Sequence, residues 1–308
     1  MSDVKNQAQL DVEELLSKVD KESSFRKLSG SHHRLVAIVA ICFSLFQLYT
    51  ASFGLLPAQM QRAVHLLFVL FLAYLLYPIR KARKSTRIPW YDGLLAVGAG
   101  LAASYIAYNY TGLMDRAGAF TTLDIIVGTL GILAVLEACR RVVGLPILII
   151  ACSFIAYAFL GPYMPGFLNH RGYSFRRIVG HLYYTTEGIL GLPLGVSSTF
   201  IFLFILFGAF LDKTGIGKFF IDVANAIAGF SAGGPAKVAV ISSAMMGTIS
   251  GSSVSNTVGT GSFTIPLMKK LGYKPEFAGA VEAAASTGGQ LMPPIMGAAA
   301  FLMAETLG

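Results

Sequence analysis

Long apolar segments alternate with short polar loops along most of the chain. An apolar segment of about 20 residues is long enough to cross the hydrocarbon core of a membrane as a helix. The expected spans are residues 35–56, 63–79, 93–110, 117–136, 142–160, 188–211 and 277–290. This pattern predicts an all-α polytopic membrane protein with multiple transmembrane helices.

One uncharged stretch is too long and too polar to be a simple span. Residues 238–268 contain 31 residues and no charged side chain, yet 15 of them are Gly, Ser or Thr. A straight helix of that length would measure about 46 Å, well beyond the ~30 Å hydrocarbon core. Backbone N–H and C=O groups that lose their helical hydrogen bonds at this depth must be covered by protein or line a watery cavity. We expect a re-entrant helical hairpin over about 236–268, with two half-helices meeting near 252–257.

A second break is expected within the apolar segment at about 276–294. Its end reads Ser286-Thr-Gly-Gly-Gln-Leu-Met-Pro-Pro294. Two consecutive prolines remove two backbone donors and end or kink a helix. The broken helix would present Ser286, Thr287 and unpaired carbonyls to the hairpin tip.

The two breaks supply the candidate binding residues. Exposed helix N-termini can bind an anion and free carbonyls can bind a cation, an arrangement that secondary transporters use at the membrane midplane. The candidates for substrate and ion binding are Ser250, Gly251, Ser252, Ser253, Ser255, Asn256, Thr257, Gly259, Thr260, Gly261, Ser286, Thr287, Gly288, Pro293 and Pro294. An alternative stays open, because the same small residues could form a helix-packing seam.

Charged residues at membrane depth are energetically costly and usually functional. Asp124 is expected at the outer end of a span, as an interfacial residue rather than a proton relay. Glu137, next to Arg140 and Arg141, is expected to form an ion-paired helix end. Glu282 is expected to be a structural carboxylate at the cytoplasmic end of a helix.

Three segments outside the spans carry polar or amphipathic patterns. Residues 1–34 alternate in charge and are expected to form a cytoplasmic polar tail, with a short helix near 10–19 or no fixed structure. Residues 174–187 and 216–230 each gather their apolar side chains on one helical face. Each is expected either to lie along the membrane surface or to form part of a bent span.

The basic residues predict the orientation of the chain. Lys and Arg gather before the first span, in the loop 80–87 and at Arg140-Arg141, and such loops are normally cytoplasmic. The N-terminus, Lys237 and Lys269 are then expected inside and 161–187 outside, although three arginines of that loop oppose the rule. The net charge of +8 therefore reflects topology and does not indicate nucleic-acid binding.

Composition limits the other functional classes. The chain is 55% hydrophobic and 13% charged, which fits a protein surrounded by lipid bilayer. The cysteines and histidines show no metal-ligand spacing and there is no phosphate-binding loop, so no cofactor and no ATP-driven pump are expected. An intramembrane serine hydrolase using Ser252 is disfavoured, because the membrane-proximal histidines are remote in sequence.

Several motifs resemble a known family. Residues 207–215, 233–237, 250–253, 265–273 and 288–294 resemble the large membrane subunit of tripartite ATP-independent periplasmic (TRAP) transporters. The four preceding spans resemble the small subunit, as in the fused small/large (4TM/12TM) permeases that work with TAXI-type binding proteins. On this resemblance, 35–143 is a four-helix small-subunit-like region and 144–308 is the N-terminal part of the large subunit.

The resemblance implies an elevator-type secondary transporter in a bacterial or archaeal inner membrane. A periplasmic binding protein would deliver a small organic acid, such as a dicarboxylate, and a cation gradient, usually Na⁺, would drive symport. Ser255 and Asn256 are the suspected Na⁺ ligands, because a hard cation prefers oxygen ligands, and Ser255-Asn-Thr257 resembles the hairpin tips of divalent-anion/sodium symporters.

The resemblance also raises a question of completeness. The sequence ends after the first proline-broken element, whereas the family has a second, inverted repeat. The chain is thus expected to hold the first repeat only, as a truncated large-subunit part. The alternative function is a membrane scaffold or interaction subunit without transport activity of its own.

Overall fold

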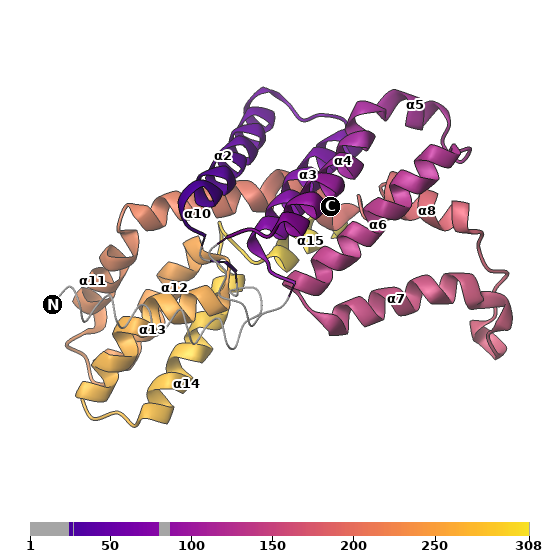
Figure 1. Ribbon diagram of the computed structural model, residues 1–308. Coiled ribbons are helices and arrows are strands. Elements are labelled where there is room, and N and C mark those ends of the chain that lie inside the picture. The colour runs from indigo at the N-terminus through magenta and orange to yellow at the C-terminus, as the bar shows by residue number, and fades with distance from the viewer. Residues whose placement is uncertain (1–24, 27, 80–86, 308) are drawn as a thin grey trace. The chain divides into compact units, whose positions relative to one another are not determined.

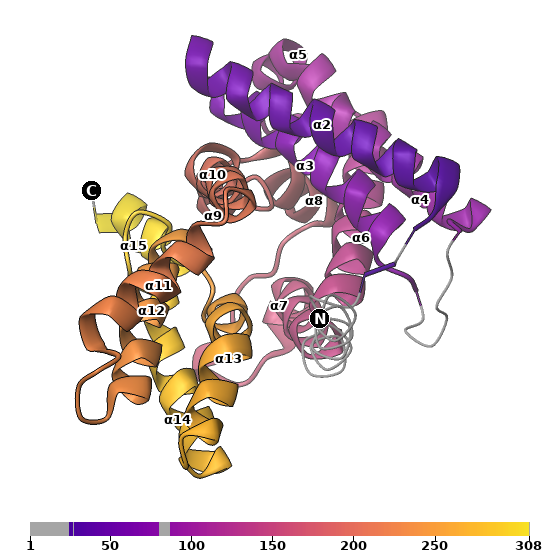
Figure 2. The ribbon, with the colours of Figure 1, turned by 90° about the vertical axis from the view of Figure 1, so that its left-hand side faces the viewer.

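The computed structural model describes residues 25–26, 28–79 and 87–307. Within these ranges the regular structure is helical and no strand occurs, which confirms the predicted all-α class. Residues 1–24 of the expected polar tail, with its short helix, and residues 80–86 of the basic loop lie outside the described residues. The last five residues of the expected tail, 30–34, belong instead to the first described helix, Gly30–Phe53. The chain divides between Gly195 and Val196 into two compact units, called unit 1 and unit 2 (Figures 1 and 2).

Unit 1 is built from apolar helices joined by short turns. Its described helices are α2 (Gly30–Phe53), α3 (Ala58–Leu76), α4 (Trp90–Tyr108), α5 (Tyr110–Asp115), α6 (Thr122–Val142), α7 (Leu145–Leu160) and α8 (Phe175–Tyr184), with 3₁₀ turns η1 (Gly161–Tyr163) and η2 (Gly166–Leu168). Helices α3 and α4 lie side by side (Figure 1). Small residues of α4, such as Ala96 and Ala103, are fully buried and allow this close packing.

Helix α8 packs against α6 through two glycines. A side-chain carbon at Gly131 would collide with the ring of Tyr183, and one at Gly128 would lie 2.8 Å from a methyl of Val179. Tyr183 is completely buried by this packing. The expected amphipathic helix is thus confirmed, and its apolar face lies on protein.

Unit 2 contains the predicted hairpin. Its elements are the π-helical turn η3 (Ser197–Ile201), α10 (Phe202–Lys213), α11 (Ile216–Ala228), α12 (Gly234–Ser250), α13 (Ser253–Lys270), α14 (Pro275–Ser286), the 3₁₀ turn η4 (Thr287–Gln290) and α15 (Ala298–Leu307). The short α9 (Leu192–Val196) crosses the division between the units. Helices α12, α13 and α14 pack on one another (Figure 2).

Among the residues that the structure describes, five helical segments are long and apolar enough to cross a membrane: 30–53, 58–76, 122–142, 145–163 and 192–213. Each overlaps a span predicted from the sequence, and together they confirm a polytopic membrane protein. Two further predicted spans, at α4 and α14, are not among the five. Helix α14 has only 12 residues, or about 18 Å, because it gives way to η4 at Thr287.

The division into units falls at a different place from the predicted domain boundary near residue 143. Helices α7 and α8, which the prediction assigns to the large-subunit part, belong to unit 1. Packing of α8 on α6 accounts for this. Compactness alone does not assign segments to subunits, so the predicted domain organisation stays a prediction.

Candidate functional site

The hairpin turns at two residues, Gly251 and Ser252. Helix α12 ends at Ser250 and α13 begins at Ser253, with the side chain of Ser252 accepting a hydrogen bond from the Ser255 amide at 3.3 Å. Gly251 has a left-handed φ of +61°, and a side-chain carbon there would lie 3.1 Å from the carbonyl oxygen of Met296. The predicted helix break is confirmed, slightly earlier than the centre of the expected 252–257 region.

The segment after α14 folds over this turn. The Ile295 amide donates to the carbonyl of Thr248 at 3.1 Å, and the Gln290 side chain donates to the Ser253 hydroxyl at 3.3 Å. The two breaks that the sequence predicts therefore lie against each other within unit 2.

Gly289 permits the closest part of this contact. A side-chain carbon at Gly289 would lie 3.1 Å from Ser250 Oγ and 3.2 Å from both Asn256 Nδ2 and the Ser252 carbonyl oxygen. Gly247 on α12 faces the same backbone, since its added carbon would lie 3.1 Å from Gly289 Cα. Oxygen and nitrogen atoms from α12, the turn and α13 thus surround one glycine.

A buried hydrogen-bond relay runs beneath the turn. The Asn256 side-chain amide donates to Ser243 Oγ at 3.1 Å, Ser243 Oγ lies 3.0 Å from Ser286 Oγ, and Ser286 Oγ donates to Glu282 Oε1 at 3.0 Å. All four side chains are fully buried. The relay connects α12, α13 and α14.

Glu282 ends the relay among hydroxyl groups. Thr260 and Thr264, one helical turn apart on α13, both donate to its carboxylate. Gly261 makes room for it, because a side-chain carbon there would lie 3.0 Å from Glu282 Cγ. Within the described ranges no Lys, Arg or His forms an ion pair with Glu282, and no cluster of metal-binding His, Cys, Asp and Glu occurs.

Asn256 leaves one buried oxygen without a partner. Its Nδ2 donates to the Ser243 carbonyl at 2.9 Å as well as to Ser243 Oγ, but Oδ1 accepts no hydrogen bond from any described residue. A buried acceptor without a partner costs about 1–3 kcal/mol relative to a satisfied one. This oxygen is therefore an unsatisfied acceptor at the end of the relay.

The suspected Na⁺ ligands face in different directions. Asn256 is fully buried, whereas Ser255, the preceding residue of α13, is exposed. Consecutive helical residues point about 100° apart. The two side chains therefore lie on different faces of α13, and their role as Na⁺ ligands stays a prediction.

The other predicted residues fall into three groups. Asn256, Thr260, Gly261 and Ser286 are buried in or beside the relay. Half-buried positions at the tip or along α13 are Ser250, Gly251, Ser252, Ser253, Thr257 and Gly259, with Gly288 half-buried in η4. Thr287, Pro293 and Pro294 are exposed, and the Pro293–Pro294 peptide is cis.

Sequence analysis missed Ser243, Thr264 and Gly289 and gave Glu282 only a structural role at a helix end. A signal was present: Asn256, Thr260 and Thr264 recur every fourth residue and so share one face of α13. Glu282 and Ser286 have the same spacing on α14. A buried polar stripe opposite a carboxylate is therefore readable from the sequence once the hairpin is assumed.

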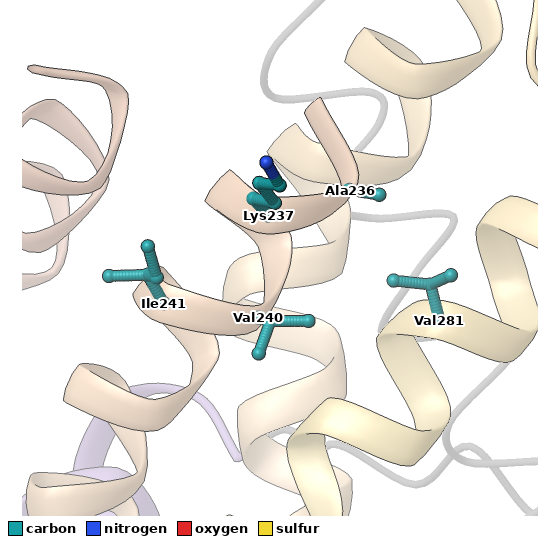
Figure 3. Close-up of a pocket in the computed structure, with 5 residues that line it drawn as sticks. All are labelled: Ala236, Lys237, Val240, Ile241 and Val281. Carbon is teal, nitrogen blue, oxygen red and sulfur yellow. The ribbon is translucent and has the colours of Figure 1, made fainter. Parts of the chain in front are cut away.

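A separate hollow of about 340 Å³ lies between α12 and α14 (Figure 3). Its lining is Ala236, Lys237, Val240, Ile241 and Val281. Apart from Lys237 the lining is apolar, and none of the predicted binding residues contributes to it. We assign no ligand to this hollow.

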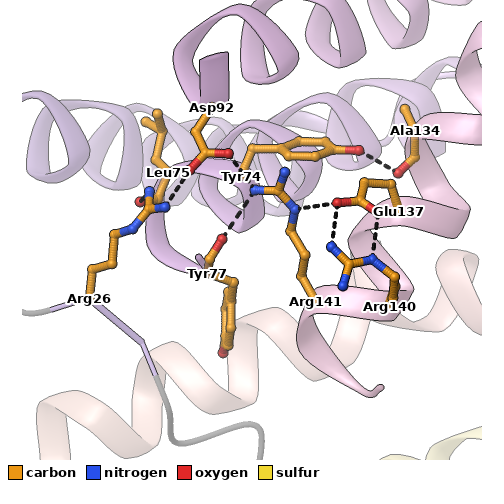
Figure 4. Close-up of polar contacts among 9 residues, drawn as sticks. All are labelled: Arg26, Tyr74, Leu75, Tyr77, Asp92, Ala134, Glu137, Arg140 and Arg141. Atoms are coloured by element: carbon orange, nitrogen blue, oxygen red, sulfur yellow. Dashed lines mark hydrogen bonds and ion pairs between the residues drawn. The ribbon is translucent and has the colours of Figure 1, made fainter. Parts of the chain in front are cut away.

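Unit 1 contains a second polar cluster, made of charged residues (Figure 4). Asp92, at the start of α4, is fully buried and pairs with Arg26 on one oxygen and with Arg141 on the other. Arg141 also pairs with Glu137, which in turn binds Arg140 at 2.7 Å. The ion-paired helix end expected at Glu137 is confirmed, and Asp92 is its unexpected centre.

Asp124 is more buried than predicted. It lies at the third position of α6, fully buried, where it accepts hydrogen bonds from the Thr121 amide and from Arg116 through two nitrogens at 3.0 Å. The expected place at the end of a span is confirmed, with the carboxylate buried by protein, and its place at the membrane interface stays a prediction. It caps α6 and neutralises Arg116.

The structure combines helices able to cross a membrane with a helix–turn–helix hairpin under a broken segment. A buried polar relay runs beneath the turn of this hairpin. Together these features define a polytopic membrane protein of the transporter class. The family model described as the tripartite ATP-independent periplasmic transporter, DctM component, matches residues 130–308. This match covers more than half of the chain. The chain therefore belongs to the DctM family of TRAP transporter permeases, which are transport proteins and not enzymes.

Individual relatives agree with this family. The chain is 41% identical over 91 residues to the C4-dicarboxylate TRAP transporter large permease protein DctM of Vibrio cholerae, which covers 30% of this chain and 20% of the relative. The DctM protein of the same description from Pseudomonas aeruginosa is 37% identical over 91 residues, with 30% and 21% covered.

A third relative is the isethionate TRAP transporter permease protein DctMQ of Oleidesulfovibrio alaskensis. It is 33% identical over 91 residues, with 30% of this chain and 14% of the relative covered. The chain spans about a fifth of the length of the first curated relatives it matches. No solved structure is significantly similar to it.

Proposed function

We propose that the chain forms part of the membrane permease of a TRAP transporter that imports a small organic anion by symport with a cation, Na⁺ in the first instance. A periplasmic binding protein delivers the anion. Family membership supports the permease role, and the oxygen chemistry at the hairpin supports the coupling ion.

The unpaired Oδ1 of Asn256 is the observation that carries the cation proposal. It is a neutral oxygen, fully buried beside a helix break, in a region without charged side chains between Lys237 and Lys269. Na⁺ is a hard cation that prefers such oxygens. The C-terminal end of α12 meets the turn as well, and its partial negative charge favours a cation.

The anion proposal rests on the other side of the same turn. Helix α13 begins there at Ser253. The Ser255 amide is capped by Ser252 Oγ, whereas the amides of Ser253 and Val254 lack partners within the helix. A helix N-terminus of this kind favours a carboxylate or sulfonate. The names of the relatives, C4-dicarboxylate and isethionate permeases, fit an anionic substrate.

The fused-permease organisation is also a proposal. Unit 1 holds helices α2, α3, α4 and α6 before the bulk of the family match, which begins at residue 130. These four helices correspond to the predicted small-subunit-like region. The relative from Oleidesulfovibrio alaskensis is named DctMQ, and this name supports such an organisation. Its alignment with the chain is limited to 91 residues.

The test is uptake by the complete transporter in proteoliposomes. Radiolabelled C4-dicarboxylate and isethionate are offered with and without the cognate binding protein, in inward gradients of NaCl or of choline chloride. We expect uptake only with the binding protein and the sodium gradient. Uptake that is equal in both salts contradicts sodium coupling, and the absence of uptake in every condition favours a scaffold role.

A further inference from the structure

The orientation of the Asn256 amide is fixed by its neighbours. The Ser243 carbonyl oxygen can only accept a hydrogen bond, and it lies 2.9 Å from the end of the amide that faces it. That end must therefore be the Nδ2 donor, with Oδ1 turned away. Ser243 Oγ takes the second Nδ2 hydrogen at 3.1 Å.

The remaining hydrogens of the relay follow in one direction. Ser243 Oγ accepts from Asn256 and has one hydrogen of its own, which it directs to Ser286 Oγ at 3.0 Å. Ser286 has one hydrogen, which it donates to Glu282 Oε1 at 3.0 Å. Glu282 Oε1 accepts this hydrogen, so every bond of the relay runs from Asn256 towards the carboxyl group.

We propose that Glu282 is a positioning residue for the coupling cation: acting through Ser286 and Ser243, its carboxylate holds the Asn256 amide so that Oδ1 is free to bind the ion. This inference rests on the proposed function and adds a residue that does not touch the ion. A donor in place of the carboxylate disturbs the relay. Ser243 Oγ is then no longer held as an acceptor for Nδ2, and the Asn256 amide is oriented by the Ser243 carbonyl alone.

No other charged group in these helices takes over the role of Glu282. The charged residues of the helices packed around it are Lys237 at the start of α12, Lys269 and Lys270 at the end of α13, and Glu276 at the start of α14. All stand at helix ends, and none pairs with Glu282 in the described part of the chain. The contacts of the carboxylate are the hydroxyls of Thr260, Thr264 and Ser286.

Thr264 provides a matched control. It donates to Glu282 Oε2 from α13 and is as buried as Ser286, but it bonds neither Ser243 nor the Asn256 side chain. Thr264→Val removes a hydroxyl from the same carboxylate without breaking the path to Asn256. A purely structural role of Glu282 predicts similar effects for the two hydroxyls, whereas the relay predicts different ones.

The experiment measures the half-saturating Na⁺ concentration for uptake in the complete transporter, with maximal rate and membrane level recorded in parallel. Glu282→Gln and Ser286→Ala are each expected to raise that concentration about tenfold, equal to about 1.4 kcal/mol. The double variant is expected to match the stronger single variant, because both changes interrupt one relay. Thr264→Val is expected to change the half-saturating Na⁺ concentration by less than about twofold. The hydrogen bond that it removes does not orient the Asn256 amide and so contributes little to Na⁺ affinity.

Two results overturn the inference while leaving the proposed function intact. One is a half-saturating Na⁺ concentration that is the same in Glu282→Gln and Ser286→Ala as in the wild type. The other is a Thr264→Val shift as large as theirs, with additive effects in the double variant. If Glu282→Gln does not reach the membrane, Ser286→Ala, which keeps the carboxylate, decides alone. A wild-type transporter without sodium response refutes the proposed function itself.

Discussion

At the scale of single residues, the site depends on which polar atoms remain unpaired. Asn256 and Ser255 are neighbours in sequence, but only Asn256 is buried, and its Oδ1 is a buried acceptor without a partner among the described residues. Gly261 and Gly289 provide space for polar groups that larger residues would displace. The proposed function of the tip therefore rests on one amide and two glycines, more than on the number of hydroxyls.

Asn256→Ala is expected to weaken the sodium response of uptake. The change removes a buried polar partner worth about 1–3 kcal/mol, which is roughly one to two decades in apparent sodium affinity. Ser255→Ala is the matched control, since its side chain is exposed, and it should leave the response near that of wild type. Uptake at varied NaCl, with protein level measured in the same membranes, checks both. An unchanged response in Asn256→Ala would refute the binding-tip hypothesis and favour a packing seam.

Gly261→Val is expected to disturb the Glu282 cluster. An added carbon at this position lies 3.0 Å from Glu282 Cγ, so the larger valine must push that side chain from its hydroxyl partners. Gly279→Val on α14 is the control, because an added carbon there meets open space. Overpacking of a tight site costs about 1–3 kcal/mol. Thermal unfolding of the purified protein in detergent should show a lower midpoint for Gly261→Val than for Gly279→Val; equal midpoints would contradict the close approach.

At the scale of elements, the buried carboxylates tie helices together in both units. Glu282 joins α13 and α14, and Asp92 joins the start of α4 to α6 and to the segment before α2. These contacts join residues between 18 and 66 positions apart in the sequence. Loss of one carboxylate therefore affects several elements together.

Asp92→Asn is expected to destabilise unit 1 strongly. Arg26 and Arg141 both lose their buried counter-charge, and breaking a buried ion pair costs about 3–5 kcal/mol. Glu137→Gln is a milder control, because Glu137 is 30% exposed and exposed pairs contribute about 1 kcal/mol or less. The comparison of unfolding midpoints in detergent tests this expectation. A smaller loss for Asp92→Asn than for Glu137→Gln would contradict it.

The sequence predicted the elements better than the contacts between them. Apolar length located the spans, and the Gly-Ser-Thr composition of 238–268 located the hairpin, because helix length in a membrane is limited by the bilayer. It did not identify Ser243 as a partner of Asn256, since the register of α12 on α13 depends on how both pack. Asp92 was missed for the same reason: its two arginines come from segments 66 and 49 residues away.

At the scale of the whole molecule, the remaining question is how the chain crosses the membrane. The hairpin prediction requires Lys237 and Lys269, which flank α12 and α13, to face the same side. Helices α12 and α13 have 17 and 18 residues, or roughly 26 Å each. This length suits a hairpin that enters most of the membrane and returns.

Cysteine labelling tests this topology. Single cysteines at Arg83, Lys237 and Lys269, in a background without Cys42, Cys139 and Cys152, should react with a membrane-impermeant maleimide only from the cytoplasmic side. A cysteine at Phe167, in the loop expected outside, should react only from the periplasmic side and serves as the control. Labelling of Lys237 and Lys269 from opposite sides would mean that the chain crosses the membrane once between them, and would end the re-entrant hairpin model.

Gly128 and Gly131 on α6, which leave room for side chains of α8, limit how α8 can move. Tyr183 fills the space left by Gly131, and Val179 fills that left by Gly128, so α8 fits α6 at a single register. Sliding by one turn, about 5.4 Å, would move Tyr183 from Gly131 towards a larger side chain such as Val135. Helix α8 therefore cannot slide along α6 in small steps. It either moves together with α6 as a rigid body or separates from it during a conformational change.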